Sequence, residues 1–587
     1  MNKQDMDVLN ALVKGNYVNQ RKLAADCGHS LGVVNRSLRE LNEQGYVDSD
    51  IKLTDKAKKA FENGRPKNAV ILAAGFGMRM VPINMEVPKG LLEVNGEPLI
   101  ERTIKQLNSV GIKEIYIVVG FMKEYYEYLI DEYGVELVVN NEYASKNNLH
   151  SLKQVSDKLS NTYIIPCDIW CDINPYSENE LYSWYMVSDM VDDESNVRVN
   201  RKMELVSAPN GTGGNAMLGI SYLIKDDADT VKKRMEVLCS DRHNDGMFWE
   251  ETLYQHKGMF VKARVVHAAD VVEINTYEQL RELDEHSGQL ENDAIETICQ
   301  ALNVKADEIV DITVLKKGMT NRSFLFSTGK KKYIMRIPGE GTDRLIDRKH
   351  EAQVYGEISG KGICDDIAYI NPDNGYKITE FIEGARVCDP KDKKDLIRCM
   401  KKLREFHELK LKVEHEFDIF GQIEFYESLW NGEKSVFRDY EKTKEKVFSL
   451  RNIIAGNTVE KVLTHIDAVP DNFLFSGDGD DTDIRLIDWE YAAMQDPHVD
   501  IAMFCIYSFY DRTQIDELID IYFCGECDRN TRIKIYCYVS AAGLLWSNWC
   551  EYKRTLGVEF GEYSLRQYRY AKEYYKIVQE ELNEKQS

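Results

Sequence analysis

The stretch NAVILAAGFGMRMVPINMEVPKGLLEVNGEPLIER, residues 68–102, decides the fold of the middle of the chain. Its apolar run predicts a buried strand, and Gly75 and Gly77 let the chain turn and let backbone N–H groups approach phosphate oxygens. Ligands of open parallel sheets bind at this carboxyl edge. Arg79 and Lys89 follow. We therefore expect two cations beside a triphosphate, one at the leaving pyrophosphate and one at the attacked α-phosphate.

Alternating strands and helices continue outward from this stretch. The order runs through the strand NAVILAAG, the helix LIERTIKQLNSVG, the strand IKEIYIVVG, the helix KEYYEYLIDEYG and the strand VELVVNN. Such alternation predicts a parallel sheet with crossover helices. A later buried strand, NTYIIPCDIW, contains Asp168, and the region closes near VVEINTYEQLRELDEHSG.

The glycine turn carries an extended motif, G-x-G-x-R, followed by Pro-Lys with the lysine ten residues after the arginine. Over roughly 68–285 the chain resembles the nucleoside triphosphate transferases that make NDP-sugars and CDP-alcohols, and especially bacterial CTP:phosphocholine cytidylyltransferases. The resemblance implies a Rossmann-like fold and catalysis by Lys89 and Arg79. It also implies a nucleotide-binding loop made of Ala73, Ala74, Gly75 and Gly77. A purely structural turn between strand and helix is the alternative.

The same resemblance implies a magnesium site. Asp168 would hold Mg²⁺ between the nucleotide phosphates and the acceptor, since Mg²⁺ prefers hard oxygen ligands combined with phosphate. The second ligand is open. The segment VVEINT offers Glu273, with Asn275 where an aspartate is expected. Met78, where these enzymes often have Ser or Thr, is a smaller departure from the family pattern.

A choline head group would require an aromatic wall and a carboxylate. The segment MFWEETL supplies Trp249 and Glu250 in a position that resembles this pocket of the family. A plain core tryptophan is the alternative interpretation.

A second phosphate-handling motif lies near the carboxyl terminus. THIDAVPDNFLF contains His465, Asp467 and Asn472, and LIDWE contains Asp488. The spacing H-x-D-x₄-N, followed by an aspartate on a strand, matches protein-kinase logic. There the first aspartate accepts the substrate hydroxyl proton, and the asparagine and second aspartate hold Mg²⁺. Since HID replaces HRD and DWE replaces DFG, the segment resembles choline kinases and aminoglycoside phosphotransferases rather than protein kinases.

Upstream segments fit the same kinase resemblance. KKGMTNRSFLF predicts a glycine-containing turn over phosphates, and KYIMRIPG places Arg336 where kinases have their strand lysine. Glu351 on the next helix would pair with Arg336. ITEFIEG resembles the hinge that binds adenine and contains Glu380 and Ile382. A degenerate pseudokinase is the alternative.

Tryptophans suggest how the kinase would bind choline. Trp546 and Trp549 lie three apart in LLWSNWCEYKR, on one helical face, and Trp489 follows Asp488. The choline-kinase resemblance places aromatic rings here, where cation–π attraction of roughly 1–2 kcal/mol per ring would favour a quaternary ammonium. Core tryptophans on an apolar helix are the alternative.

Residues 1–65 predict short helices and a small hairpin and resemble a MarR-like winged helix-turn-helix. A third helix, opened by Ser30, would present Asn35, Arg36 and Arg39 to the major groove of DNA. An interaction or autoregulatory module of the same shape is the alternative, since this segment is nearly neutral.

Length and composition predict three domains in 587 residues, at 1–65, 66–288 and 289–587. The expected fold class is multidomain α/β and α+β: a winged helix, a Rossmann-like nucleotidyltransferase domain and a bilobal protein-kinase-like domain. The net charge of −23 argues against a general polyanion binder. We see no signal peptide and no membrane span, and we expect free thiols and a cytoplasmic location.

The two sites predict consecutive reactions. The kinase would make phosphocholine from choline and ATP, and the transferase would couple phosphocholine to CTP, with Mg²⁺ at both sites. One alternative keeps both chemistries with a sugar or another amino alcohol as substrate. Another is a transcriptional regulator that only senses choline or CDP-choline, with DNA or a protein as the partner of the winged helix.

Overall fold

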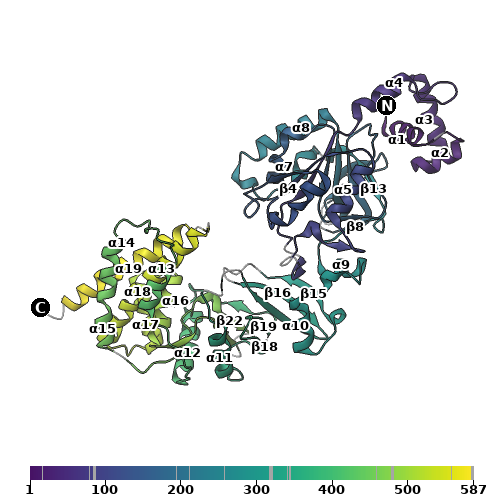
Figure 1. The fold of residues 1–587 in the computed structure, drawn as a ribbon. Helices are drawn as coiled ribbons and strands as arrows, with labels where there is room; N and C mark the ends of the chain where they lie inside the picture. The colour runs from purple at the N-terminus through teal and green to yellow at the C-terminus, as the bar shows by residue number, and fades with distance from the viewer. Residues whose placement is uncertain are drawn as a thin grey trace. The chain divides into compact units, whose positions relative to one another are not determined.

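The computed structural model divides the chain into two compact units, Met1–Glu296 and Thr297–Ser587 (Figure 1). It describes residues 1–583 apart from 16, 78–79, 84–86, 194, 210–211, 257, 316–320, 340–341, 343–344, 458, 478–481, 557 and 559. Each unit buries hydrophobic cores of its own.

A mixed sheet forms the centre of the first unit. Its first half is parallel, in the order β5 (Glu136–Val139), β4 (Glu114–Val119), β1 (Asn68–Ala73) and β6 (Thr162–Pro166). It continues through β11 (Gly214–Leu223), β8 (Trp184–Asp192), β13 (Gly258–Val266), β10 (Glu204–Ser207) and β9 (Val197–Val199), with β12 (Tyr254–Gln255) beside β13. Strand β11 is antiparallel to both of its neighbours. The predicted parallel half is therefore confirmed, and a mixed extension is added to it, antiparallel except for the parallel pair of β8 and β13.

Helices cover both faces of this sheet because side chains alternate along β1. Ala69 and Ile71 face the core beneath α5 (Leu99–Ser109) and α6 (Tyr128–Tyr133). Val70 faces the core beneath α7 (Asn148–Lys153) and α8 (Lys225–Leu238). Two short ribbons, β2 (Glu93–Val94) with β3 (Glu97–Pro98) and β7 (Ile169–Cys171) with β14 (Val271–Glu273), and helix α9 (Tyr277–Leu283) complete the fold. The carboxyl ends of β1 and β6 thus lie side by side.

Four helices precede the sheet: α1 (Lys3–Lys14), α2 (Gln20–Cys27), α3 (Leu31–Glu43) and α4 (Asp55–Gly64). Ser30 caps α3 by accepting from the N–H of Val33 at 3.4 Å, and Val47 bridges Leu53 to make the small wing. The predicted helices and hairpin are confirmed.

The second unit begins within α10 (Asp293–Leu302) and contains an antiparallel sheet. Its order is β15 (Val310–Val314), β16 (Asn321–Thr328), β17 (Lys331–Pro338), β19 (Lys377–Glu380) and β18 (Ile367–Ile370). Helix α11 (Arg348–Ile358) lies between β17 and β18 in the chain. The three antiparallel strands predicted from the sequence correspond to β15, β16 and β17.

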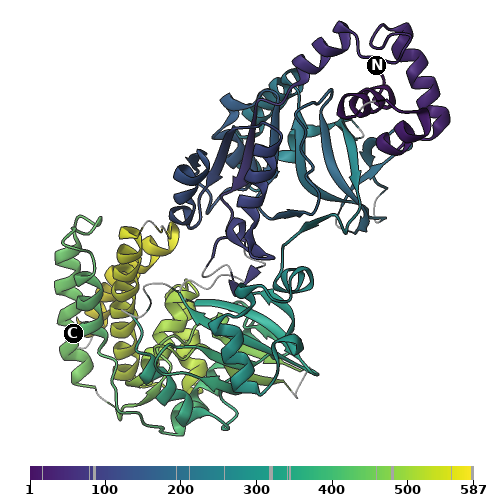
Figure 2. The same ribbon diagram turned by 45° about the vertical axis from the view of Figure 1, so that its right-hand side comes forward.

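The rest of this unit is mainly helical. Its helices are α12 (Lys393–Glu408), α13 (Ile419–Ser428), α14 (Tyr440–Ser449), α15 (Arg451–Ala455), α16 (His498–Tyr507), α17 (Arg512–Phe523), α18 (Arg529–Thr555) and α19 (Glu562–Asn583). The last two pack along each other, in yellow-green and yellow in Figure 2. The short strands are β20 (Arg386–Val387), β21 (Val462–Thr464), β22 (Phe473–Ser476), β23 (Asp483–Leu486) and β24 (Ala493–Gln495). Loops between β21 and β22 and between β23 and β24 hold the predicted kinase motifs.

Among the described residues, no helix combines the length and apolar character needed to cross a bilayer. All thirteen cysteines are free thiols, as expected, including Cys524 and Cys527, which have Cys-x-x-Cys spacing.

Candidate active sites

A cavity of about 500 Å³ opens where β1 and β6 end in the first unit. Of the predicted transferase residues, it is lined by Ala74, Gly75, Gly77, Lys89, Asp168, Trp249 and Glu250. Ala73 belongs to the buried end of β1. Arg79 and Met78 lie outside the described residues. The glycine turn, the lysine and the strand-end aspartate are therefore brought together, as their positions in the sequence predict.

Lys89 is the central charge of this cavity. Its ammonium forms an ion pair with Asp168 and donates a hydrogen bond to Oδ1 of Asn275 at 2.7 Å. Burial works to lower the pKa of Lys89, but the Asp168 carboxylate raises it above its ordinary value. Gly77 has a φ of +59°, and a β-carbon there would lie 3.4 Å from the Lys89 side chain. A glycine therefore suits both the turn and the close approach of the lysine.

Asp168 and Asn275 lie close enough to share one cation, because the Lys89 ammonium touches both. Strand β7 begins directly after Asp168 and pairs with β14, which ends two residues before Asn275. The N–H of Ile274 donates to the Asp168 carbonyl at 2.9 Å. Oδ1 of Asp168 is buried and has no hydrogen-bond partner among the described residues. A hard cation fits this oxygen, and Asn275 supplies a second oxygen beside it. Glu273 is the last residue of β14, two positions earlier.

Trp249 and Glu250 differ in how they meet the cavity. Trp249 is 1% exposed and packs in the core, 6.2 Å from the Tyr185 ring. Burial raises the pKa of Glu250 to about 7. The Tyr185 hydroxyl accepts from the N–H of Gly219 at 3.1 Å and donates to Oε1 of Glu250 at 3.1 Å. Oε2 of Glu250 is buried without a partner among the described residues, so it is available to a ligand. Sequence reasoning missed Tyr185, which stands inside an apolar strand.

A second cavity, of about 570 Å³, lies in the second unit. Of the predicted kinase residues, it is lined by Arg336, Glu380, Ile382, Asp467, Asn472, Asp488, Trp546 and Trp549. These come from five separate segments that together span more than 200 residues of the chain. Residues 316–320, with the predicted glycine turn over the phosphates, lie outside the described residues.

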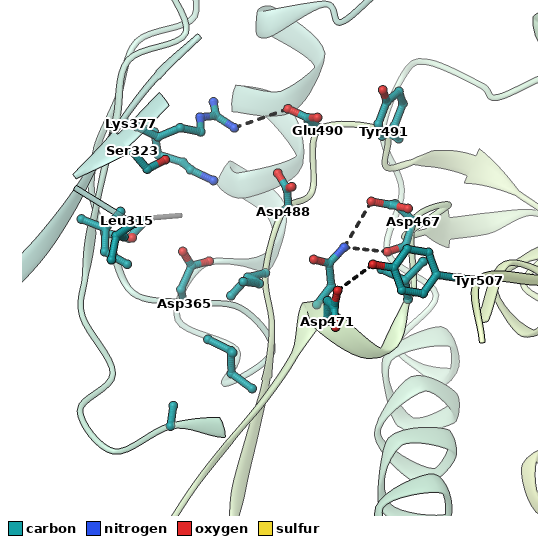
Figure 3. Close-up of a pocket in the computed structure, with 18 of the residues that line it drawn as sticks. Leu315, Ser323, Asp365, Lys377, Asp467, Asp471, Asp488, Glu490, Tyr491 and Tyr507 are labelled. Carbon is teal, nitrogen blue, oxygen red and sulfur yellow. Dashed lines mark hydrogen bonds and ion pairs between the residues drawn. The ribbon is translucent and has the colours of Figure 1, made fainter. Parts of the chain in front are cut away.

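Acidic side chains crowd one end of this cavity (Figure 3). Asp467 and Asp488 face the same opening, and Glu490 stands beside them. Nδ2 of Asn472 donates to the carbonyl of Asp467 at 2.8 Å and to its Oδ2 at 3.2 Å. Burial, Asp488 and Glu490 together raise the pKa of Asp467 to about 8. A divalent cation fits such a cluster because it would relieve the repulsion between its carboxylates.

Two strained residues shape this cluster. Ile466 has a φ of 68° and Asp488 a φ of 66°, a region that residues other than glycine rarely adopt. Asp500 on α16 holds the first strained segment by accepting from the N–H groups of His465 at 3.0 Å and Ile466 at 2.7 Å. Nε2 of His465 donates to the carbonyl of Ile487 at 3.0 Å. The two motifs are thus joined to each other and to α16, and sequence reasoning missed Asp500.

The predicted ion pair between Arg336 and Glu351 is formed. Arg336 on β17 makes two parallel hydrogen bonds to Glu351 on α11, one of them 2.7 Å long. Glu380 and Ile382 lie at the end of β19, where the hinge was predicted.

Aromatic rings line the remaining wall. Trp546 and Trp549 on α18 meet edge to face at 5.6 Å, and Tyr491 meets Trp546 at 6.0 Å. Trp489 lies elsewhere. It is fully buried, donates to the Leu486 carbonyl at 2.9 Å and packs against Phe406. Tyr491, two residues further on, lines the cavity instead, and Trp489 does not form part of its wall.

The predicted DNA-reading residues Asn35, Arg36 and Arg39 are exposed on α3. Arg36 donates to Gln4 and lies 3.7 Å from Glu40. The wing carries two acidic residues, Asp48 and Asp50.

Within the described part of the chain, no cluster of three or more His, Cys, Asp or Glu residues is arranged to hold a metal ion. Mg²⁺ does not require such a cluster, because it is usually held by one or two carboxylates and completes its shell with substrate phosphates and water.

Three family models match successive parts of the chain. Residues 1–48 match a winged helix-turn-helix DNA-binding model, 69–173 a MobA-like NTP transferase domain, and 312–521 choline/ethanolamine kinase. The predicted three-part fold class is confirmed by these matches and by the sheets of both units.

The chain covers nearly the full length of curated relatives of each enzyme part. Choline-phosphate cytidylyltransferase of Streptococcus pneumoniae is 29% identical over 37% of this chain and 96% of its own length. 2-Aminoethylphosphonate cytidylyltransferase of Lancefieldella rimae is 30% identical over 38% of this chain and 94% of its own. Protein LicA of Haemophilus influenzae is 25% identical over 42% of this chain and 95% of its own.

The middle of the chain therefore belongs to the cytidylyltransferase family, and the protein is a transferase whose MobA-like NTP transferase domain stands between a winged helix-turn-helix and a choline/ethanolamine kinase domain.

Proposed function

We propose that the protein is a bifunctional choline kinase and CTP:phosphocholine cytidylyltransferase. The observation that carries this proposal is the kinase cavity. It joins an acidic cluster suited to metal and phosphate with a wall of Trp546, Trp549 and Tyr491. Such rings attract a trimethylammonium group, which cannot donate hydrogen bonds.

In the kinase step, Asp467 would accept the proton of the choline hydroxyl as its oxygen attacks the γ-phosphate of ATP. The raised pKa of Asp467, caused first by burial, supports a role as proton acceptor. Asn472 and Asp488 would hold Mg²⁺, which would neutralise charge on the phosphates. Arg336 would bind ATP phosphates, and the backbone near Glu380 and Ile382 would bind adenine.

In the transferase step, a phosphocholine oxygen would attack the α-phosphate of CTP, and pyrophosphate would leave. The loop from Ala73 to Gly77 would cradle the triphosphate. Lys89 and Arg79 would stabilise the developing charge, and the attacking phosphate needs no general base. Asp168 would hold Mg²⁺. We propose Asn275 as its second ligand, ahead of Glu273, because its oxygen shares the Lys89 ammonium with Asp168.

A second candidate keeps both chemistries and changes the alcohol. The free Oε2 of Glu250 would accept a hydrogen bond from a primary ammonium, and the similarity to an aminoethylphosphonate enzyme supports such a substrate. Trp249 offers less of a wall here because it is almost fully buried.

A panel of alcohols and nucleotides on the purified chain tests the proposal. With Mg²⁺, ATP and CTP, choline should yield CDP-choline faster than ethanolamine or free sugars do. ATP use that is indifferent to choline contradicts the substrate assignment. Phosphocholine or aminoethylphosphonate, supplied with CTP alone, then assigns the acceptor of the transferase separately.

We further propose the domain boundaries 1–65, 66–288 and 289–587, and a cytoplasmic location, where ATP and CTP are available. A regulator that senses choline is the remaining alternative, supported by the exposed Asn35, Arg36 and Arg39 on α3. Binding to duplex DNA that changes with choline or CDP-choline, measured by gel shift, would support it. Turnover without DNA binding would exclude it.

A further inference from the structure

The inner wall of the kinase cavity holds more buried charge than the proposed phosphate transfer uses. Arg336, Glu490, Lys377 and Asp365 line it, and Glu351 and Arg348 pair with these lining residues. All six are between 1% and 8% exposed. Burying an ion is costly unless it is paired, so each of these charges requires a partner. Figure 3 shows Lys377 and Asp365 on the sheet side of the opening, across from Asp488.

The Glu351 carboxylate is the centre of this wall. Arg336 binds both of its oxygens, and Nη1 of Arg348 approaches Oε2 at 3.1 Å. Nζ of Lys377 lies 3.7 Å from Oε1. Burial opposes the effect, but Lys377 and Arg336 lower the pKa of Glu351 to about 2. One carboxylate is therefore shared among three cations.

Lys377 is held in place from a different element. It begins β19, and its ammonium donates to the Tyr355 hydroxyl on α11 at 2.6 Å. It also lines the nucleotide cavity, and it lowers the otherwise raised pKa of the buried Asp365. Lys377 therefore ties the hinge strand to the helix that carries Glu351.

This sharing matters for phosphate binding. A guanidinium in a two-bond pair with one carboxylate has much of its charge neutralised locally, which weakens its attraction for a nucleotide. The three buried cations, Arg336, Arg348 and Lys377, balance the three buried carboxylates, Glu351, Asp365 and Glu490. Loss of one cation would therefore leave excess negative charge beside Arg336, where the nucleotide phosphates would bind. Arg348 lies 3.1 Å from Glu351 and 3.5 Å from Glu490 and is therefore shared between them, whereas Lys377 pairs with Glu351 at 3.7 Å.

We propose that Lys377 is a positioning residue for the ATP phosphates, acting through Glu351 to keep the charge of Arg336 available to the nucleotide. The proposal rests on the proposed kinase function. The conservative variant Lys377→Arg should therefore preserve ATP binding, whereas loss of the charge should weaken it without changing choline binding.

Binding of MgATP to the full chain, measured by calorimetry, tests this. Lys377→Met should raise the Kd for MgATP about tenfold and leave the KM for choline within about twofold. Lys361→Met, on an exposed loop of the same unit, is the control and should bind MgATP like the wild type. If Lys377→Met fails to fold, Lys377→Gln replaces it, because glutamine keeps a hydrogen-bond donor toward Tyr355.

A double-mutant cycle with Glu351→Gln separates the routes by which Lys377 could act. If Lys377 acts through Glu351, the effect of Lys377→Met on the Kd should fall to about twofold or less in the Glu351→Gln background. A tenfold effect that persists there would mean direct contact with the nucleotide and would overturn the proposal. So would a Lys377→Met protein that binds MgATP as the wild type does. A wild-type chain that binds no MgATP contradicts the kinase function instead.

Discussion

The two cavities balance their charges in opposite ways. In the transferase cavity Lys89 already pairs with the predicted metal ligand Asp168 and reaches Asn275 as well. In the kinase cavity Asp467, Asp488 and Glu490 face one opening, and the main cations are held on the far wall by Glu351. Without ligands, the charge of the transferase site is neutralised, whereas the kinase site has excess negative charge.

This difference indicates what each site requires of its ligands. The kinase cluster is relieved only when a cation arrives, so metal and nucleotide should bind cooperatively there. In the transferase cavity, Lys89 must exchange the Asp168 carboxylate for a substrate phosphate. We therefore expect the loss of Lys89 to affect this site more than any other substitution in it. Substitutions at matched positions can test the comparison.

Replacing Asp467 should give the largest effect. Asp467→Asn removes the proposed proton acceptor and should lower kcat for choline phosphorylation about 10²–10⁴-fold. Formation of CDP-choline from added phosphocholine and CTP should be unchanged. Coupled assays for ADP and pyrophosphate measure both steps on one preparation, and loss of both activities in a folded protein would contradict two separate sites.

Replacing Lys89 should produce the reverse pattern. Lys89→Met removes transition-state charge stabilisation and should lower cytidyl transfer about 10²–10³-fold while leaving the kinase unaffected. Lys89→Arg keeps the charge but changes its geometry, so partial activity is expected from it. An unaffected pyrophosphate release in Lys89→Met would mean that the pair with Asp168 is purely structural.

Asp500→Asn should have an intermediate effect, confined to the kinase. It weakens hydrogen bonds to the N–H groups of His465 and Ile466, each worth about 1.5–3 kcal/mol when the acceptor is charged. We expect kcat to fall about tenfold and the melting temperature of the second unit to decrease. Glu526→Gln, an exposed change in the same unit, is the control. A lower melting temperature with full activity would restrict Asp500 to a structural role.

The smallest effect is expected from Glu250→Gln. Burial raises the pKa of Glu250 to about 7, so the folded protein binds a proton more tightly there than the unfolded chain does. Stability from this group is therefore present at pH 4–5 and is lost as the pH rises toward and beyond 7.

Melting curves between pH 5 and pH 8 can measure this. At pH 5 the Glu250→Gln variant should have the same melting temperature as the wild type. At pH 8 its melting temperature should be higher than that of the wild type. Its exposed neighbour offers the control Glu251→Gln, which should show no such trend. If the difference in melting temperature between the wild type and Glu250→Gln is the same at pH 5 and pH 8, Glu250 remains charged in the folded protein.

Much of this could be predicted from the sequence because the motifs follow local rules. The turn at Gly75 and Gly77, Asp168 just after the end of β6, and the H-x-D-x₄-N spacing each follow from a short stretch of chain. The structure shows that these stretches converge on two cavities. The roles assigned to their side chains stay predictions.

Contacts between distant segments could not be predicted in this way. Asp500, Tyr185 and Lys377 act through partners 34 to 65 residues away or on other elements. Asp500 and Tyr185 stand in apolar stretches without a motif, and Lys377 lies just before the hinge segment ITEFIEG, which gives no sign of its partners. Trp489 shows the converse error. Its position beside Asp488 suggested that it forms part of the substrate wall. In the turn after β23, however, Asp488 faces the cavity and the next residue, Trp489, points into the core.

The bonds that join the kinase motifs have a practical consequence. His465 donates to the Ile487 carbonyl, and the Ile487 N–H donates to the Asn472 carbonyl at 3.0 Å, so both ends of the β22–β23 hairpin are clamped. The two strands of this hairpin thus hold Asn472 and Asp488 in register with each other. A fluorescent reporter on an exposed residue of the hairpin would therefore follow nucleotide occupancy in a working enzyme.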